Sequence, residues 1–471
     1  MVKGTRVGRR GWVVGLLALM IGGAAVDVHA QGCPGQQAQR DGRVPETRGE
    51  VVTNRASPPG RLRWPGHPAH CSEADPGPIV FWLSIDGVRS DYLDRAETPN
   101  LDRLIAEGAS SRELQPAFPS LTFPSHVSMA TGAKPSEHGI PSNVFYDRDE
   151  DTVFAYPPWA WMLEAEPIWL TAARQGVRTA VIDWPLSHDQ KGEVRTDYFD
   201  DRFPRGVSDE QRLTRVLQLW EDDQAGDHDA PLRLIMAYIT GPDSVGHIHG
   251  PDSDVVIASM ARTDELIGEM LEQITARFDQ HPERAGYVII TTDHGMAKVE
   301  TLVHLGHLSQ VEGDERIQQA TGGNVGHLFF KIEDTAEREK AVAEALAAIA
   351  LHPFATAYRQ DELPKAWGYE HPTRVGDVVV VLENGHTFSR RADGVSSPVD
   401  DRGPLGMHGY HPDTQPEMLG PAIFWRYPEP LGKTNLGPIH ALQLHATVAQ
   451  LLKITPAEQA DPDAIELIEA E

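Results

Sequence analysis

The chain has 471 residues, of which 40% are hydrophobic and 24% charged, and its formal net charge at pH 7 is −27. This length and apolar content suffice for one large α/β domain with an insertion, or for two domains. So acidic a chain lacks the basic surface that binds a long polyanion such as duplex DNA, whereas a small phosphate ester is compatible if metal cations reverse the local field.

Residues 1–30 have the pattern of an export signal. Basic residues come first, the apolar stretch 12–25 follows, and Val28-His29-Ala30 supplies a small-residue cleavage site. The apolar stretch is too short for a comfortable transmembrane helix, so we expect no transmembrane segment. The sequence therefore predicts a periplasmic or secreted protein, cleaved near Ala30. The pair Arg9-Arg10 leaves twin-arginine export open as an alternative route.

Residues 31–77 predict an extended N-terminal arm, because they are rich in Pro, Gly and Arg and show no hydrophobic periodicity. The two cysteines of the chain, Cys33 and Cys71, both lie in this arm. Two cysteines in an exported chain favour one disulfide between them.

Three short apolar runs predict strands that are buried on both faces of a parallel sheet. The runs and the polar residues behind them are 79–85 with Asp86, 232–239 with Asp243 and His247, and 287–292 with Asp293 and His294. Helical patterns, such as the one that begins at Pro99 and stops at Gly108, alternate with the strands and favour a doubly wound, mostly parallel sheet flanked by helices. Ligands bind beyond the carboxyl ends of such strands, so we expect these carboxylates and imidazoles to converge.

A candidate nucleophile lies in the segment 118–126. Pro124 and the run up to Gly132 predict a helix, which places Thr122 just before the positive end of the helix dipole. A threonine hydroxyl is a poor nucleophile unless a metal or a base lowers its pKa. The simpler alternative is that Thr122 only caps the helix.

The pattern changes after residue 300, where we predict a small αβ cap at residues 301–400. Its elements are a strand at 328–332, a helix at 335–350 and a strand at 377–382. The cap interrupts a catalytic α/β core that comprises residues 78–300 and 401–455. The last core helix is expected at 442–452, and residues 456–471 form an acidic tail.

Aspartate, histidine and a hydroxyl are the components of a two-metal phosphoryl-transfer site. Mixed Asp and His ligation suits zinc, or less often manganese or iron, whereas calcium and magnesium prefer oxygen ligands alone. Two such ions, about 4 Å apart, can clamp the attacking and leaving oxygens of an in-line displacement.

Seven short motifs, in order along the chain, extend this interpretation. They are Ser84-Ile85-Asp86-Gly87, Thr122-Phe123-Pro124, Glu137-His138-Gly139-Ile140 with Asn143, Glu166-Pro167-Ile168-Trp169, Pro242-Asp243-Ser244 with His247, Thr292-Asp293-His294-Gly295-Met296 and His408-Gly409-Tyr410. Together they resemble the nucleotide pyrophosphatase/phosphodiesterase family of the alkaline phosphatase superfamily. The resemblance runs from about residue 79 to residue 452 and implies an alkaline phosphatase-like fold.

The resemblance implies two zinc ions and a set of site residues. One zinc would be held by Asp243, His247 and His408, and the other by Asp86, Asp293, His294 and the Thr122 oxygen. Thr122 would attack phosphorus to give a phosphothreonine ester, while the backbone N–H of Phe123 and the side chain of Asn143 hold the non-bridging oxygen. Phe123 would stack on a nucleobase, with Tyr198 as a second wall.

The implied function is an exported two-zinc phosphodiesterase or nucleotide pyrophosphatase that acts on a small nucleotide or phosphodiester and releases nucleoside monophosphates. A phosphomonoesterase, a phosphonoacetate-type hydrolase and a non-catalytic zinc-binding protein are the alternatives. His411 competes with His408 as a ligand, and the family pattern selects His408. Trp159, Trp161 and Trp169 could form an aromatic cage for a choline headgroup or simply pack in the core.

Overall fold

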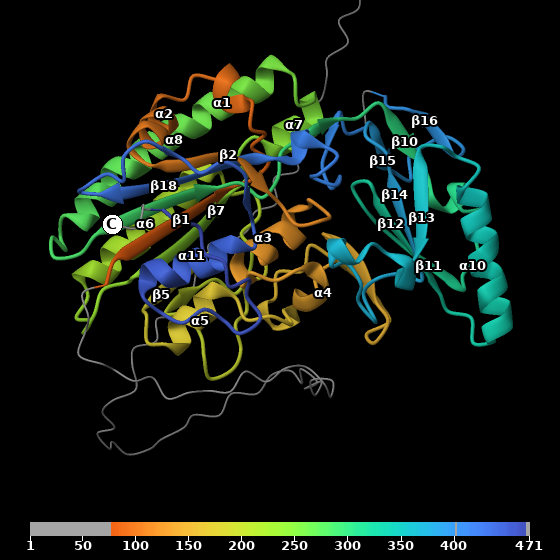
Figure 1. Cartoon of the computed structure of the whole chain (residues 1–471), viewed down its shortest axis with the longest axis horizontal. Helices are drawn as coiled ribbons and strands as arrows, with labels where there is room; N and C mark the ends of the chain where they lie inside the picture. The colour runs from red at the N-terminus through yellow and green to blue at the C-terminus, as the bar shows by residue number, and fades with distance from the viewer. Residues whose placement is uncertain (1–76, 401–402, 468–471) are drawn as a thin grey trace, which may run out of the picture.

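The computed structural model describes residues 77–400 and 403–467. The predicted export signal and the proposed pairing of Cys33 with Cys71 lie outside these residues. A large sheet flanked by helices forms one part of the molecule, and a group of smaller sheets lies beside it (Figure 1).

The large sheet has the strand order β19-β2-β18-β8-β1-β7-β5-β6, and β20 also pairs with β2. Its strands are β1 (Ile79–Ile85), β2 (Ala109–Gln115), β5 (Thr179–Ile182), β6 (Tyr198–Phe199), β7 (Leu234–Ile239), β8 (Gly286–Thr291), β18 (Gly420–Tyr427), β19 (Thr434–Asn435) and β20 (Ile439–His440). β1 pairs in parallel with β7 and β8, whereas β18 runs antiparallel to both of its neighbours, β8 and β2. The predicted mostly parallel sheet is confirmed, with β18 as the exception.

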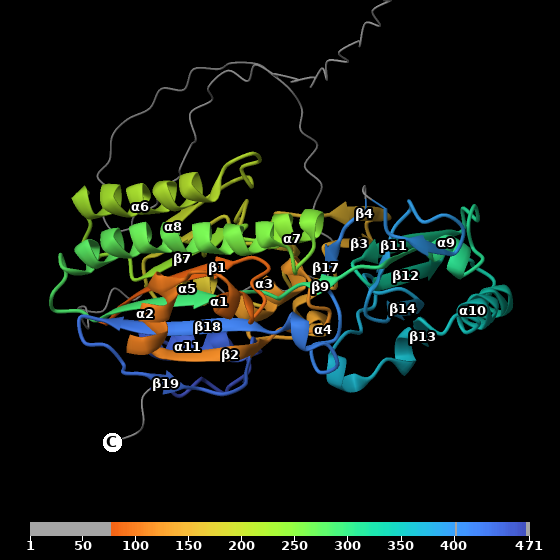
Figure 2. The same ribbon diagram turned by 90° about the horizontal axis from the view of Figure 1, so that it is seen from above.

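Helices cover both faces of the sheet (Figure 2). On one face lie α1 (Tyr92–Arg95), α2 (Pro99–Glu107), α6 (Asp209–Ala225) and α8 (Asp254–Phe278), and on the other α3 (Thr122–Thr131), α5 (Ile168–Arg174) and α11 (Gln443–Leu452). Successive side chains of a strand point to opposite faces. In β1, therefore, Val80 and Trp82 pack toward α3, α5 and α11, and Phe81 and Leu83 pack toward the other helices. Every residue of β1 is buried, which explains its unbroken apolar run.

Residues 301–400, which we call the cap segment, contain three groups of elements. These are a three-stranded sheet of β10 (Thr301–Val303), β15 (His386–Phe388) and β16 (Ser396–Pro398), a four-stranded sheet of β11 (Ile317–Gly322), β12 (Val325–Phe330), β13 (Ala355–Arg359) and β14 (Val378–Leu382), and the helices α9 (Leu305–Leu308) and α10 (Thr335–Ile349). A separate hydrophobic cluster, which includes Leu328, Ile349 and Val380, lies between them. The predicted helix and both predicted strands are confirmed, with ends shifted by a few residues.

The remaining short elements lie outside the large sheet and its covering helices. They are α4 (Pro135–His138), the hairpin of β3 (Val144–Asp147) and β4 (Thr152–Ala155), α7 (Asp243–His249), the strand pair β9 (Ala297–Lys298) and β17 (Gly406–Met407), 3₁₀ turns at 160–162 and 416–418, and two more 3₁₀ turns inside the cap segment, at 360–362 and 365–367. The strand β3 lies against β11 of the cap segment. Across the described ranges, no helix combines the length and the apolar character needed to cross a membrane.

Three buried histidines make the free energy of unfolding sensitive to acid. Burial lowers the pKa of His138 and His327 to about 3 and that of His445 to about 4. An unfolded histidine titrates near pH 6.5, so below that value the unfolded chain takes up protons that the folded chain refuses. This contribution to stability is therefore fully present well above pH 6.5 and is lost as the pH falls from there to the folded-state pKa values of about 4 and about 3.

We expect His445→Gln to reduce this acid dependence. His445 Nδ1 donates to the Ala130 carbonyl and its Nε2 accepts the Ala457 N–H, at 2.8 and 3.0 Å, and glutamine can approximate these bonds without titrating. Urea unfolding between pH 6.5 and 4.5 should show a slope smaller by about 1.4 kcal/mol per pH unit. An unchanged slope would contradict the assignment of a neutral, buried His445.

Candidate active site

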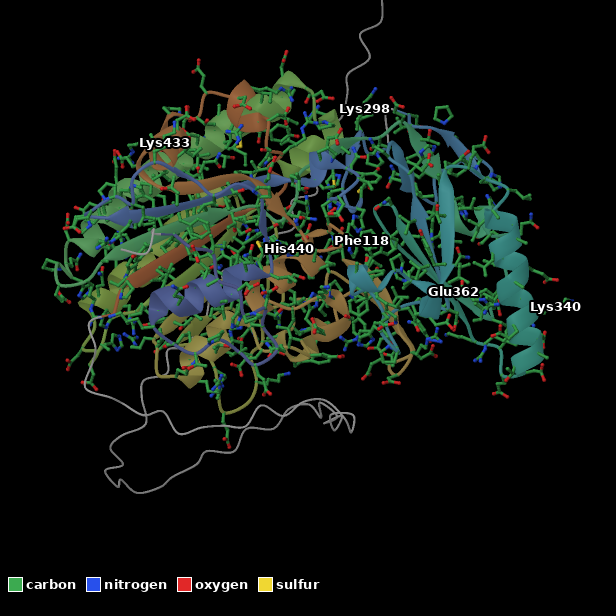
Figure 3. The ribbon with its side chains drawn as sticks, viewed as in Figure 1. Phe118, Lys298, Lys340, Glu362, Lys433 and His440 are labelled. Atoms are coloured by element: carbon green, nitrogen blue, oxygen red, sulfur yellow. The ribbon has the colours of Figure 1, made fainter. Side chains whose placement is uncertain are left out.

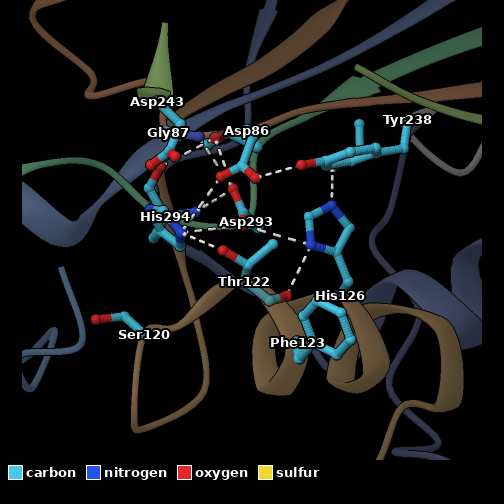
Figure 4. A network of polar contacts seen from close by, with 12 residues as sticks. Asp86, Gly87, Ser120, Thr122, Phe123, His126, Tyr238, Asp243, Asp293 and His294 are labelled. Carbon is cyan, nitrogen blue, oxygen red and sulfur yellow. Dashed lines mark hydrogen bonds and ion pairs between the residues drawn. The ribbon is translucent and has the colours of Figure 1, made fainter. Parts of the chain in front are cut away.

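The residues expected to carry chemistry meet beyond the carboxyl ends of β1, β7 and β8. Asp86 follows β1, Asp243 and His247 lie in α7, Asp293 and His294 follow β8, His408 follows β17, and Thr122 begins α3. Figure 4 shows the carboxylates of Asp86 and Asp293 and the ring of His294 directed toward the Thr122 hydroxyl. The structure thus brings together all seven residues that the resemblance implied as metal ligands.

His294 lies at the centre of this cluster. Its Nε2 is 3.3 Å from Thr122 Oγ1, 3.4 Å from Asp86 Oδ1 and 3.1 Å from Asp293 Oδ2. Its ring is nearly parallel to that of His408, with 3.5 Å between the ring centroids. Two groups of potential ligands share His294, one with Asp86 and Asp293 and the other with Asp243 and His408.

Asp243 joins the remaining histidines to the cluster. Its Oδ1 is 3.4 Å from His247 Nε2 and 3.7 Å from His408 Nε2. The rings of His247 and His408 are 5.1 Å apart between centroids. The cluster thus contains two adjoining sets of carboxylate and imidazole groups that are candidates for metal binding.

All three histidines are held in the tautomer that a metal ligand needs. The Nδ1 of His247, of His294 and of His408 donates to the carbonyl of Gly406, Gly295 and Ser120, respectively, at 2.8, 2.9 and 3.0 Å. A carbonyl oxygen only accepts, so each Nδ1 carries a proton and each Nε2 is the ring nitrogen left for a metal at the centre of the site. Backbone bonds of this kind orient metal-bound imidazoles.

The carboxylates leave oxygens that need a cation. Asp86 Oδ1, Asp243 Oδ1 and Asp293 Oδ2 are buried and accept no hydrogen bond within the described part of the chain. Burial, together with the charges of Asp293 and Asp243, raises the pKa of Asp86 well above its usual range. Buried acceptors of this kind are costly unless they are paired, so the residues present fit a bound divalent metal.

Burial also favours a neutral His408. Burial and the neighbouring rings of His294 and His247 hold the pKa of His408 well below its usual value. A histidine must be neutral to bind a metal, so this environment keeps His408 ready as a ligand.

The Thr122 side chain does not cap its helix. The N-cap position of α3 is Leu121, and no side chain there accepts a hydrogen bond from the helix. Thr122 is buried, and its hydroxyl faces His294 instead. This placement favours the nucleophile interpretation over the capping one.

Two residues that the sequence did not single out as functional support the ligands. The Tyr238 hydroxyl donates to Asp86 Oδ2 at 2.6 Å. His126 Nδ1 donates to the Thr122 carbonyl at 2.8 Å and lies 3.4 Å from Asp293 Oδ2. His126 is one helical turn after Thr122, and this spacing could have indicated that the two residues lie on the same face of the helix. Tyr238 is part of an apolar strand, where no sequence pattern distinguishes it from a core residue.

The predicted oxyanion groups lie together but are bonded to each other. The Phe123 N–H donates to Asn143 Oδ1 at 2.8 Å. Because this bond fixes the orientation of the amide, the Nδ2 donors of Asn143 point away from the Phe123 backbone. The Phe123 N–H is therefore engaged with Asn143 and is not free for a phosphoryl oxygen, whereas Asn143 keeps its Nδ2 donors.

The aromatic partner of Phe123 is Tyr156. Their ring centroids are 5.6 Å apart and the rings meet edge to face. Tyr198 lies elsewhere, since its ring packs in the hydrophobic cluster beneath α6 and its hydroxyl donates to Asp223 Oδ1 at 2.8 Å. Phe203 is a further partly exposed ring, 6.3 Å from the ring of Tyr238. The structure therefore brings Tyr156, not Tyr198, to Phe123.

The three tryptophans do not form a closed cage. Trp169 is fully buried in the core, whereas the rings of Trp159 and Trp161 stack at 5.9 Å and Trp161 is partly exposed. The competing ligand His411 also lies elsewhere, with its ring against Phe118 at 5.2 Å. These positions agree with packing roles.

A third group of Asp and His side chains has the spacing of a metal site, but its charges are already balanced. Asp183, His188 and Asp200 lie together and are buried. Arg212 pairs with Asp183 at 2.5 Å, and Arg215 pairs with both carboxylates. A divalent cation here would lack compensating negative charge, so we assign this group to an ion-pair network.

The chain is similar in sequence to a known family and to individual proteins. The family described as type I phosphodiesterase/nucleotide pyrophosphatase matches residues 80–411. An uncharacterized pyrophosphatase/phosphodiesterase of Schizosaccharomyces pombe is 32% identical over 343 residues, which cover 70% of this chain and 68% of the relative. A bis(5′-adenosyl)-triphosphatase of Xenopus laevis is 29% identical over 356 residues, which cover 73% of this chain and 72% of the relative.

Solved structures have the same fold. The human ectonucleotide pyrophosphatase/phosphodiesterase family member 5 aligns with a TM-score of 0.68 at 23% identity, over 83% of this chain and 100% of that one. An inactive variant of the murine member 5, solved in complex with AMP, aligns with a TM-score of 0.67 at 24% identity, over 83% of this chain and 97% of that one. The predicted alkaline phosphatase-like architecture is confirmed.

Proposed function

Since the chain belongs to the type I phosphodiesterase/nucleotide pyrophosphatase family, whose members are metal-dependent hydrolases, we propose that it is a two-zinc enzyme that cleaves nucleotide phosphodiester or pyrophosphate bonds and releases nucleoside monophosphates. The observation that carries this proposal is the convergence of three carboxylates with unpaired oxygens and three oriented imidazoles around the Thr122 hydroxyl. The similarity to a bis(5′-adenosyl)-triphosphatase supports nucleotides with linked phosphates as substrates.

The proposed ligands fall into two sets. Asp243, His247 and His408 would hold one ion, and Asp86, Asp293 and His294, with the Thr122 oxygen, would hold the other. When bound, the ions lower the pKa of the threonine hydroxyl and offset the charge of the phosphoryl group. Manganese or iron are the alternatives to zinc that this mixture of ligands allows.

The chain's own residues would carry the reaction in two displacements. Thr122 Oγ1 forms a bond to phosphorus while the bond to the leaving oxygen breaks; the hydroxyl proton passes to solvent, and the leaving oxygen takes up a proton from solvent where its pKa requires one. Water then attacks the phosphothreonine ester, the bond from phosphorus to Oγ1 breaks, and Thr122 regains its proton. The Asn143 amide would donate to a non-bridging oxygen in both steps.

The substrate's base would contact the aromatic pair next to the nucleophile. Phe123 is adjacent to Thr122 and Tyr156 lies across its ring, so a nucleobase that enters here meets an aromatic face within reach of the phosphoryl group. We further propose that the protein acts after export, in the periplasm or outside the cell.

Relative rates on three substrates test the proposal. With zinc, we expect p-nitrophenyl thymidine 5′-monophosphate to be hydrolysed faster than bis-p-nitrophenyl phosphate, and p-nitrophenyl phosphate to be the poorest substrate by at least about tenfold in kcat/KM. A preference for the monoester would contradict the diesterase assignment and favour a phosphomonoesterase.

A further inference from the structure

The loop that carries Asn143 is held from outside by the cap segment. This loop, residues 139–143, runs from α4 into β3 and ends at Asn143, whose amide faces the backbone of Phe123. Side chains from residues 369–374 of the cap segment reach across and bind backbone groups on both sides of it. Figure 3 shows Phe118, a neighbour of this contact, where the large sheet meets the cap segment.

Arg374 makes the most extensive of these contacts. It is 1% exposed, and its guanidinium donates to Asp147 Oδ2 at 2.9 Å, to the Gly139 carbonyl at 2.6 Å and to the Met162 carbonyl at 3.1 Å. Gly139 begins the loop, and Asp147 ends β3, the strand that follows Asn143 directly. One buried side chain thus fixes both ends of the backbone that presents Asn143.

Tyr369 holds the middle of the same loop. Its hydroxyl donates to the Pro141 carbonyl at 2.9 Å, and it accepts from His327 Nε2 at 3.0 Å. Its ring also meets the ring of Phe118 edge to face, with 5.3 Å between the centroids, and Phe118 lies four residues before Thr122. A second buried group of the cap segment therefore supports the loop independently of Arg374.

The geometry leaves Arg374 little freedom to serve another purpose. Asp147 is also 1% exposed. An ion pair buried so deeply is stable only where its geometry is good and its other polar atoms are hydrogen-bonded. The guanidinium also contacts Glu164 at 3.2 Å, in the segment that follows Tyr156, and lies over the ring of Phe145 in β3 at 5.7 Å. All of its partners belong to the stretch of chain that carries Asn143 and Tyr156.

We propose that Arg374 is a positioning residue for Asn143, so that the cap segment sets the geometry of transition-state stabilisation rather than only covering the site. This proposal rests on the proposed function, because it acts through the role assigned to Asn143. Loss of Arg374 would let the loop shift and would weaken the bond from the Asn143 amide to the phosphoryl oxygen, which matters most in the transition state.

A double-mutant cycle tests the proposal. Loss of one oxyanion donor lowers kcat by about 100-fold or more, so we expect a loss of that size in Asn143→Ala. Arg374→Met should lower kcat by about tenfold or more in the unchanged chain, change KM by less than about threefold, and lower kcat by less than about twofold in the Asn143→Ala background. A partly buried ion pair between the same two segments supplies the control. Arg148→Met removes the 3.0 Å contact with Asp377 and the stacking of the guanidinium over the Phe329 ring at 5.0 Å, and it should leave kcat unchanged because neither partner carries Asn143.

The outcomes separate the two claims. Equal losses from Arg374→Met in both backgrounds would overturn the positioning role and leave the diesterase assignment intact. An Asn143→Ala variant as active as the unchanged chain would overturn the assigned role of Asn143 and, with it, this proposal. If Arg374→Met does not fold, the milder Tyr369→Phe decides, with an expected loss of about threefold that disappears in the Asn143→Ala background.

Discussion

Thr122→Ala is expected to abolish hydrolysis of p-nitrophenyl thymidine 5′-monophosphate, with kcat lower by about a thousandfold or more, because the variant lacks the oxygen that attacks phosphorus. The hydroxyl faces His294 Nε2 at 3.3 Å and makes no capping bond to α3. The fold should therefore tolerate its loss, and the melting temperature should change by less than a few degrees.

The control for this variant is Thr122→Ser, which keeps the hydroxyl and should retain activity within about a hundredfold. Zinc content, measured by elemental analysis of both variants, must stay close to that of the unchanged chain for the comparison to hold. Equal turnover by Thr122→Ala and the unchanged chain would show that Thr122 is not the nucleophile. It would also revive the interpretation of a metal-binding protein whose chemistry lies elsewhere or is absent.

Removal of the metals is expected to stop turnover and to destabilise the fold together. The carboxylates of Asp86, Asp243 and Asp293 are close to one another and each keeps a buried oxygen that accepts no hydrogen bond, so their charges repel and a bound cation relieves the repulsion. At a free metal concentration a thousand times the dissociation constant, each site adds about 4 kcal/mol to the free energy of unfolding. A chelator should therefore lower the melting temperature by many degrees and reduce the rate to background.

Restoring the metals one at a time identifies the native ion. Zinc should return both the melting temperature and the rate, whereas magnesium should return neither, since imidazole ligands suit zinc and not magnesium. As a matched control, the third acidic group can be disrupted with Asp200→Asn, which should leave the metal dependence unaltered because Arg215 already neutralises that carboxylate. Full activity in a chelated, metal-free sample would contradict the proposed mechanism.

The sequence located the parts of the site that follow strand periodicity. Asp86, Asp243 and Asp293 come directly after, or shortly after, strands buried on both faces, and parallel strands bring their carboxyl ends to one edge. His408 is far along the chain from the other candidate ligands and follows a strand of only two residues, so it was the order of the motifs that identified it. The positions of these candidate ligands could therefore be predicted without the structure.

Other parts of the molecule depend on tertiary contacts that no local pattern records. The strand β2, with the sequence Ala-Ser-Ser-Arg-Glu-Leu-Gln, has no apolar run, and its place in the sheet follows from its pairing with β18. Tyr156 has a positive φ of 49° and was not distinguishable from loop sequence, yet it is the ring that meets Phe123. The resemblance implies Tyr198 as a second wall, but its hydroxyl bonds to Asp223 in the helix α6.

The position of β18 has a consequence for biosynthesis. Among the strands of the described residues, this one, at residues 420–427, alone joins β2 to β8, so β2 cannot pair into the sheet until ribosomal synthesis has passed residue 427. Until then the edge of β8 offers unpaired backbone groups, which recruit other chains. We therefore expect nascent or truncated chains that end before residue 420 to aggregate or to require a chaperone, and the productive fold to form late and cooperatively.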